Sequence, residues 1–170
     1  MDEFRHPKDM EALREETAES IAGKHFRRVF NFCRTLLGSD ADAEDAAQNV
    51  FLTVARRREE IPDILQPVPW LLQIARLTCL NARRERDRLR SAGGDVDEPV
   101  LAGPPIAPTE NLDRVRASIQ KLPERYRAVL TLHYQQGLSH EEMAQVLWIS
   151  RGALRVLLHR AVAKLRQETK

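Results

Sequence analysis

Residues 137–160 read GLSHEEMAQVLWISRGALRVLLHR, and this stretch decides the fold class. Ser139 and Glu142 have the spacing of a capping box, which predicts the start of a short helix. Ser150 then provides the N-cap of a second, longer helix. The apolar residues of that helix recur at helical spacing, at Leu154, Leu158, Ala161 and Leu165. A short helix, a tight turn and a longer basic helix together have the spacing of a helix-turn-helix unit.

Outside this stretch, helical periodicity predicts six more helices, at about 9–22, 24–37, 41–58, 70–90, 112–122 and 123–136. The prolines of 59–69 predict a loop between the third and fourth of them. Residues 91–108, SAGGDVDEPVLAGPPIAP, hold three of the seven glycines and four of the nine prolines. We therefore predict an all-α protein of two small helical domains, 1–90 and 109–170, joined by a flexible linker at 91–108.

The charge of the chain is distributed in blocks. The net charge of +2 divides into −4 over 1–63, +4 over 64–90, −3 over 91–108 and +5 over 109–170. The near-neutral total argues against a protein that coats nucleic acid without help. The two basic blocks suit phosphates, whereas the acidic blocks suit a different partner.

Several functional classes are disfavoured by what the sequence lacks. The five histidines are scattered, and there is no phosphate loop, HExxH, CxxC or GxSxG pattern, so we predict neither an enzyme nor a metal or cofactor site. The polar first residues do not resemble a signal peptide, and no stretch is apolar enough to cross a membrane. We expect a cytoplasmic protein whose Cys33 and Cys79 are buried apolar residues, with a redox pair as the alternative.

The helix that begins at Ser150 has a basic outer face. It consists of Arg151, Arg155, His159 and Arg160, long donors that reach phosphates and guanine edges in a major groove. The alternative is an ordinary solvated face. Val156 and Leu157 lie away from the buried stripe, and three interpretations remain open for them: packing at the edge of the core, contact with thymine methyl groups, or a patch that binds protein.

Two other helices have faces of opposite character. Arg83, Arg84 and Arg86 belong to a dense basic run at the end of the 70–90 helix, which suits neutralisation of a nucleic-acid backbone or else forms a solvated helix end. Trp70 at the start of that helix either stacks on an unpaired base or belongs to the core. The 41–58 helix instead presents Asp45, Gln48, Asn49 and Leu52, a polar and acidic face that favours a protein partner.

Three motifs, taken together, resemble the extracytoplasmic-function (ECF) group of bacterial RNA polymerase sigma factors. They are LLGSDADAEDAAQNVFLTV at 36–54, PWLLQIARLTCLNARRER at 69–86 and the segment 122–167 that contains the helix-turn-helix. The first is similar to the region 2 helix that binds the polymerase clamp, and the second to the segment that melts and reads the minus-ten element. The third is similar to region 4, which reads the minus-thirty-five element.

The resemblance implies roles for particular residues. Contacts to core RNA polymerase would come from Asp45, Gln48, Asn49 and Leu52. Contacts to the minus-ten element of promoter DNA would come from Trp70, Arg76, Arg83, Arg84 and Arg86. Contacts to the minus-thirty-five element would come from Ser150, Arg151, Arg155, His159 and Arg160. The family usually has Gly where Trp148 stands, and Thr, Ser and Arg where Ala153, Val156 and Leu157 stand.

The resemblance also implies that the chain directs core polymerase to promoters and helps to open the DNA. An anti-sigma factor, membrane-bound or not, is implied as a controlling partner, while this chain itself is not expected to be a membrane protein. Two alternatives remain. One is a sigma-like mimic that captures an anti-sigma factor without touching DNA, and the other is a helix-turn-helix transcriptional regulator.

Overall fold

Seven α-helices and one π-helical turn make up the part of the chain that the structure, a computed structural model, describes: residues 18–57, 66–91 and 110–169. The helices are α2 (Ala18–Leu37), α3 (Asp40–Arg56), α4 (Pro67–Ser91), α5 (Glu110–Lys121), α6 (Glu124–Leu130), η2 (Thr131–Gln135), α7 (His140–Leu147) and α8 (Arg151–Glu168). No strand occurs in these ranges, so the all-α prediction is confirmed.

The helices α2, α3 and α4 form an N-terminal bundle, in which α2 packs against both others. Its core consists of apolar side chains spaced along one face of each helix, among them Phe32, Leu36, Val50, Val54 and Leu72. Small residues of α3 (Ala43, Ala46 and Ala47) are also buried and allow its backbone to approach α2 closely. The bundle is therefore held together mainly by the hydrophobic effect.

The two cysteines lie inside this bundle. Cys33 of α2 and Cys79 of α4 are free thiols and are almost completely buried, as the sequence predicted. Contact with the Cys33 thiol, together with burial, raises the pKa of Cys79 well above its ordinary value. Since the thiolate is the reactive form of cysteine, this environment disfavours the redox alternative.

A C-terminal bundle is formed by α5, α6, η2, α7 and α8. The predicted caps are present: Ser139 and Glu142 form the complete capping box of α7, and the Ser150 hydroxyl accepts a hydrogen bond from the Ala153 N–H at 3.2 Å. Leu154 and Ala161 are the fully buried residues of α8, and Leu158 and Leu165 are partly buried against the same core. The helix-turn-helix predicted from residues 137–160 is therefore formed by α7 and α8.

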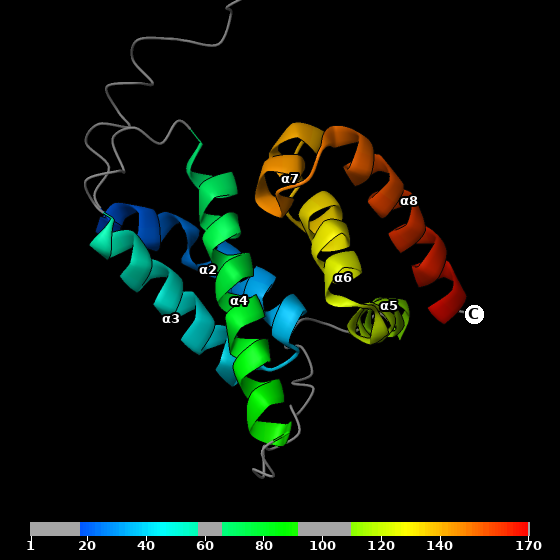
Figure 1. The fold of residues 1–170 in the computed structure, drawn as a ribbon, viewed down its shortest axis with the longest axis horizontal. Coiled ribbons are helices and arrows are strands. Elements are labelled where there is room, and N and C mark those ends of the chain that lie inside the picture. The colour runs from blue at the N-terminus through cyan, green and yellow to red at the C-terminus, as the bar shows by residue number, and fades with distance from the viewer. Residues whose placement is uncertain (1–17, 58–65, 92–109, 170) are drawn as a thin grey trace, which may run out of the picture.

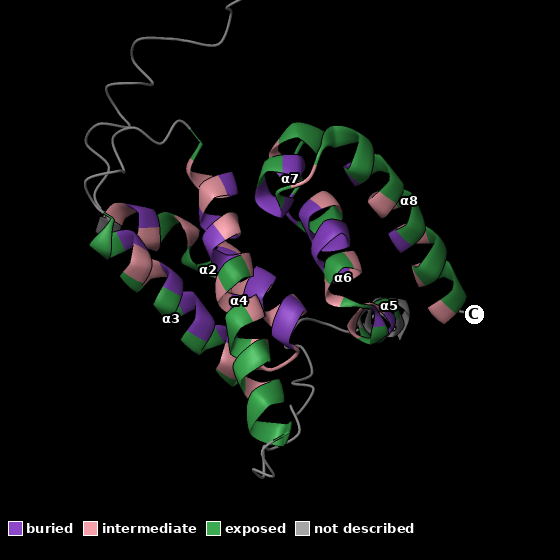
Figure 2. Ribbon diagram, in the orientation of Figure 1, coloured by how far each residue is buried: buried purple, intermediate pink, exposed green. Residues whose placement is uncertain are grey.

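The two bundles pack directly against each other. Helix α4 lies along α7, and α2 reaches across to α6 and α5 (Figure 1). Buried residues face the interior from both bundles and join into one apolar cluster (Figure 2). Helix α8 lies on the far side from the N-terminal bundle, and much of its length is exposed in the same view.

Three predicted boundaries differ from the structure. Helix α2 continues through Gly23, so residues 18–22 belong to the same helix as 24–37; the rest of the predicted helix at 9–22 lies outside the described residues. Pro67 and Pro69 lie inside the first turn of α4 rather than in a loop. The N–H groups of a first turn make no hydrogen bond within the helix, so proline, which lacks an N–H, is tolerated there. Pro123 precedes α6 as its N-cap. The predicted linker beyond Ser91 also lies outside the described residues.

Candidate nucleic-acid and protein interfaces

The solvent-facing side of α3 gathers the four residues predicted to bind polymerase. Asp45, Gln48, Asn49 and Leu52 recur at helical spacing, and all four are exposed, Leu52 by 55%. The opposite side of α3 is buried against α2 and α4. This face therefore combines one carboxylate, two amides and an exposed leucine, a mixture suited to a protein surface rather than to nucleic acid.

The predicted minus-ten residues on α4 do not form one open face. Arg84 is exposed, whereas Arg83 and Arg86 are half-buried, and the Arg86 guanidinium is ion-paired with Asp42 of α3. Trp70 is partly buried and packs against the core, as the second of its two interpretations predicted. Only part of the basic block of α4 is therefore available to phosphates in this arrangement.

Arg76 is the member of this set that points toward the other bundle. Its Nε lies 3.3 Å from Oε1 of Glu124, the first residue of α6, and the two side chains are only 17% and 16% exposed. Neither atom has a well-aligned hydrogen bond in the described part of the chain, so the contact is an ion pair without a hydrogen bond. Arg76 thus lies at the contact between the bundles instead of on the exposed surface of α4.

The outer face of α8 is open. Arg151, Arg155, His159 and Arg160 are all exposed, and the described residues offer the three arginines no ion-pair partner. Ser150 is also exposed, but its hydroxyl already caps the helix. The structure therefore brings the predicted minus-thirty-five cations together, and it gives Ser150 a structural role.

The turn between α7 and α8 is closed by Trp148. This residue has the left-handed backbone conformation, with φ 56° and ψ 44°, and its side chain is 72% exposed. It lines an open pocket with Gln145 of α7 and Gln73 of α4, so it lies where the two bundles meet. The Gln73 side-chain amide donates a hydrogen bond to the Gln145 carbonyl oxygen at 3.2 Å across the same contact.

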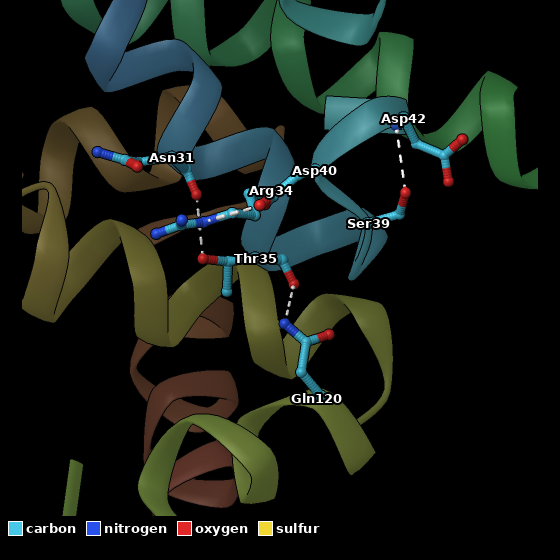
Figure 3. A network of polar contacts seen from close by, with 7 residues as sticks. All are labelled: Asn31, Arg34, Thr35, Ser39, Asp40, Asp42 and Gln120. Carbon is cyan, nitrogen blue, oxygen red and sulfur yellow. Dashed lines mark hydrogen bonds and ion pairs between the residues drawn. The ribbon is translucent and has the colours of Figure 1, made fainter. Parts of the chain in front are cut away.

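A set of polar residues that the sequence does not mark joins the bundles. The Gln120 side chain of α5 donates to the Thr35 carbonyl oxygen at 3.1 Å and accepts from Arg127 Nη1 at 2.9 Å (Figure 3 shows the first contact). Arg28 of α2 donates from Nε to the side-chain oxygen of Gln136 at 2.7 Å. No local pattern marks such residues, because their partners are far away in the sequence.

Arg127 is the most deeply buried cation of this set. Burial, with a smaller contribution from nearby Arg83, lowers the pKa of Arg127 to about 10. A buried cation is costly unless it is hydrogen-bonded, and the bonds to the side chain and carbonyl oxygen of Gln120 offset part of that cost. Gln120 and Arg127 therefore link α5 and α6 to each other, and Gln120 links them to α2.

The geometry at these faces is that of binding surfaces. Within the described residues no group of three or more histidine, cysteine, aspartate or glutamate side chains is arranged to hold a metal ion. None of the helices in those ranges is both long and apolar enough to span a membrane.

Two family models match this chain. The family model for sigma-70 region 2 matches residues 21–89, and the model for sigma-70 region 4 matches residues 112–165. The ECF RNA polymerase sigma factor SigL of Mycobacterium tuberculosis is 30% identical over an alignment of 155 residues, and the alignment covers 86% of this chain and 85% of SigL. The RNA polymerase sigma factor CarQ of Myxococcus xanthus is 29% identical over 90% of this chain and 89% of its own.

Two solved structures share the fold. The sigma factor RpoE of Bartonella quintana, solved in complex with the anti-sigma factor NepR, superposes with a TM-score of 0.78 at 19% identity, over 88% of this chain and 94% of RpoE. CnrH, solved with the cytosolic domain of CnrY, gives a TM-score of 0.65 at 22% identity, over 94% of both chains. With both sigma-70 regions present in order, this chain belongs to the ECF RNA polymerase sigma factors, and the resemblance seen in the sequence is confirmed.

Proposed function

We propose that this chain binds core RNA polymerase, directs it to specific promoters and helps to open the DNA there. It does so by binding alone, in the cytoplasm, with no cofactor and no chemistry of its own. The proposal rests on the outer face of α8, the second helix of a capped helix-turn-helix, where Arg151, Arg155 and Arg160 have no ion-pair partner among the described residues. The chain also matches both sigma-70 regions. An anti-sigma factor as controlling partner is part of the proposal.

Each element has a separate role in this proposal. The domain of residues 1–90 binds polymerase through the exposed face of α3 and binds the minus-ten element through α4. The domain of residues 109–170 binds the minus-thirty-five element through α8. The arginines hold backbone phosphates, and such contacts fix register and orientation on the duplex. Arg76 can take part only when its contact with Glu124 is given up, because that ion pair covers it.

Run-off transcription tests the proposal. The purified chain is mixed with core polymerase and a pool of candidate promoter fragments, and promoter-dependent transcripts are expected from a subset of them. A complete absence of transcripts, with the chain nevertheless retaining an anti-sigma factor in a pull-down, would favour the mimic instead.

The α3 face is tested by changing it without unfolding the helix. Asp45→Asn combined with Gln48→Ala is expected to weaken core polymerase binding by about tenfold or more, which is ~1.4 kcal/mol, because both exposed side chains lose their partner contacts. Glu141→Gln, which removes an exposed carboxylate from α7, is the matched control. Equal polymerase affinity for the α3 variant and the control would show that α3 does not bind polymerase.

A further inference from the structure

The outer face of α8 has a centre that differs from its edges. At 3.6 residues per turn, Gly152 and Val156 lie in the middle of the exposed arc, with Arg155 and His159 on one side and Arg160 on the other. Val156 is 51% exposed, and Ala153 is exposed as well. A small apolar centre is thus surrounded by long cationic side chains.

The structure separates the two apolar residues that the sequence could not tell apart. Leu157 is partly buried and packs against the core of the C-terminal bundle, so its position is explained by folding. Val156 is only one residue further back, yet it points to solvent and contributes little to that core. An exposed valine at the centre of a binding face is available to a ligand.

Gly152 leaves room in front of this centre. A Cβ atom built on Gly152 would meet nothing nearer than the Ser150 hydroxyl, at 3.9 Å. The residues near the N-terminal end of a recognition helix are those that reach base edges in a major groove. The first two turns of α8 therefore offer a flat, uncharged surface between arginines that suit phosphates.

The chemistry of this surface is selective among bases. Valine and alanine methyl groups neither donate nor accept hydrogen bonds, so they cannot satisfy the polar edges of guanine, adenine or cytosine. The C5 methyl group of thymine is the apolar group that a major groove presents, and apolar side chains contact it. The cationic rim favours DNA over an apolar protein partner, because a partner that covered Val156 would also have to neutralise Arg155 and Arg160.

We propose that Val156, with Ala153 beside it, contacts thymine methyl groups, and that α8 thereby selects an upstream promoter element with thymine at those positions. The inference rests on the proposed function and specifies its DNA sequence preference. Hydrogen-bond readout is left to the arginines at the edge of the face, whereas the centre reads by methyl contact.

The test uses holoenzyme assembled from the full chain and core polymerase. Promoter fragments with a randomised upstream element are selected by binding, and thymines in the selected element are then replaced by deoxyuridine, which lacks only the methyl group. Affinity is expected to fall about fourfold for each methyl that Val156 or Ala153 contacts. Deoxyuridine elsewhere in the fragment is expected to have no effect.

A variant assigns the effect to the side chain. Val156→Ala should weaken binding to the thymine-containing element and should largely remove the difference between thymine and deoxyuridine. Val115→Ala is the matched control, because Val115 is an exposed valine on α5, away from α8's outer face. In urea unfolding, the free energy of unfolding of both variants should equal that of the parent chain within about 0.5 kcal/mol.

Each other outcome counts against the inference. Selected elements without thymine, or holoenzyme that transcribes selectively but binds deoxyuridine DNA equally well, would overturn the methyl contact and leave the proposed function intact. Failure to form a transcribing holoenzyme at all would overturn the proposed function itself. Loss of the deoxyuridine effect in the Val115 control would overturn the assignment to Val156.

Discussion

Trp148 is the residue whose backbone is most clearly strained. It is the one non-glycine residue with positive φ in the described ranges, and an L-residue in this conformation costs about 1–2 kcal/mol. Its N–H donates to the Gln145 carbonyl oxygen at 3.2 Å, and the Ile149 N–H donates to that of Ala144 at 3.1 Å, so the conformation closes α7. The indole is 72% exposed, so most of its apolar surface contributes nothing to the core.

Glycine at this position should be more stable than another residue without the indole. Trp148→Gly is expected to raise the free energy of unfolding by about 0.5–1 kcal/mol relative to Trp148→Ala, because glycine adopts positive φ without a Cβ penalty. Both variants remove the indole, so their difference isolates the backbone contribution. Urea unfolding measures it, and equal stability of the two variants would contradict the presence of strain.

Individual side chains also show where prediction from sequence ends. The exposure of Arg151 and Arg155 followed from the apolar stripe on the other side of α8, since helical periodicity alone fixes which face is buried. The different exposure of Val156 and Leu157 could not be predicted. Both lie away from the buried stripe, and which of them is covered depends on the helices packed against α8. The burial of Arg76 depended on Glu124, which is 48 positions away in the numbering.

Among the helices, α8 depends on the residue that begins it. The Ser150 hydroxyl accepts the Ala153 N–H, and the first turn of α8 contains no acidic residue that could take over this role. The sequence predicts Ser150 both as this N-cap and as a DNA contact; the cap is confirmed, and the DNA contact stays a prediction. The helix that presents the arginines proposed to bind DNA therefore has one side-chain hydrogen bond at its start.

Removing this cap should lower stability, whereas replacing it with another capping residue should not. Ser150→Ala is expected to lower the free energy of unfolding by about 1 kcal/mol, whereas Ser150→Asp should retain the parent value, since aspartate is an equally good N-cap. Thermal or urea unfolding of the two variants checks this. Ser150→Asp should still weaken DNA binding, because it places a carboxylate near phosphates. Unchanged stability in Ser150→Ala would mean that the hydroxyl does not act as a cap.

Element boundaries were predictable where the signal is local. The caps at Ser139 and Ser150 were predicted and found, because capping depends on residues within three positions of each other. The predicted start of α4 at about residue 70 is wrong, because the first turn of a helix tolerates Pro67 and Pro69. The π-helical turn η2, where the Gln136 N–H donates to the Thr131 carbonyl oxygen, had no local signal.

The two bundles are held in one arrangement by a shared apolar cluster and by polar contacts around it. The Arg76–Glu124 ion pair is mostly buried, so removal of either partner leaves a charge that water reaches poorly. Glu124 also lies in the first turn of α6, where a negative charge is favourable. This ion pair is the most direct place to test how firmly the bundles are joined.

Glu124→Gln should loosen the contact between the bundles. We expect the free energy of unfolding to fall by about 1–2 kcal/mol, because Arg76 loses its partner and α6 loses a favourable first-turn charge. Urea unfolding followed by circular dichroism measures this, and a broader or two-step transition would show that the bundles then unfold separately.

The matched control removes a similar carboxylate from an exposed ion pair. Glu85 contacts Arg88 one turn away on α4, and both side chains are more than half exposed. Its hydrogen bond with Arg88 lowers the pKa of Glu85, but Glu85→Gln should leave stability nearly unchanged, since exposed pairs are well solvated. Equal effects of the two substitutions would contradict a special role for Glu124.

The change of composition and periodicity at about residue 91 predicts two helical units. The packing of these units against each other could not be predicted. It depends on Arg28, Gln73 and Gln120 meeting partners from the other bundle, and none of these residues carries a local pattern that would reveal it. The predicted faces of α3 and α8 remained open, whereas part of the predicted face of α4 is covered.

The position of Trp148 where the bundles meet also makes the chain its own optical reporter. The chain has two tryptophans, one in each bundle, and Trp148 lines the pocket that Gln73 of α4 completes. Indole fluorescence depends on the groups around the ring, and separation of the bundles removes Gln73 from this pocket. The emission of Trp148 is therefore expected to respond to separation without an attached dye. Trp70 packs partly against the core and emits in the same range, so a Trp70→Phe variant isolates the signal of Trp148.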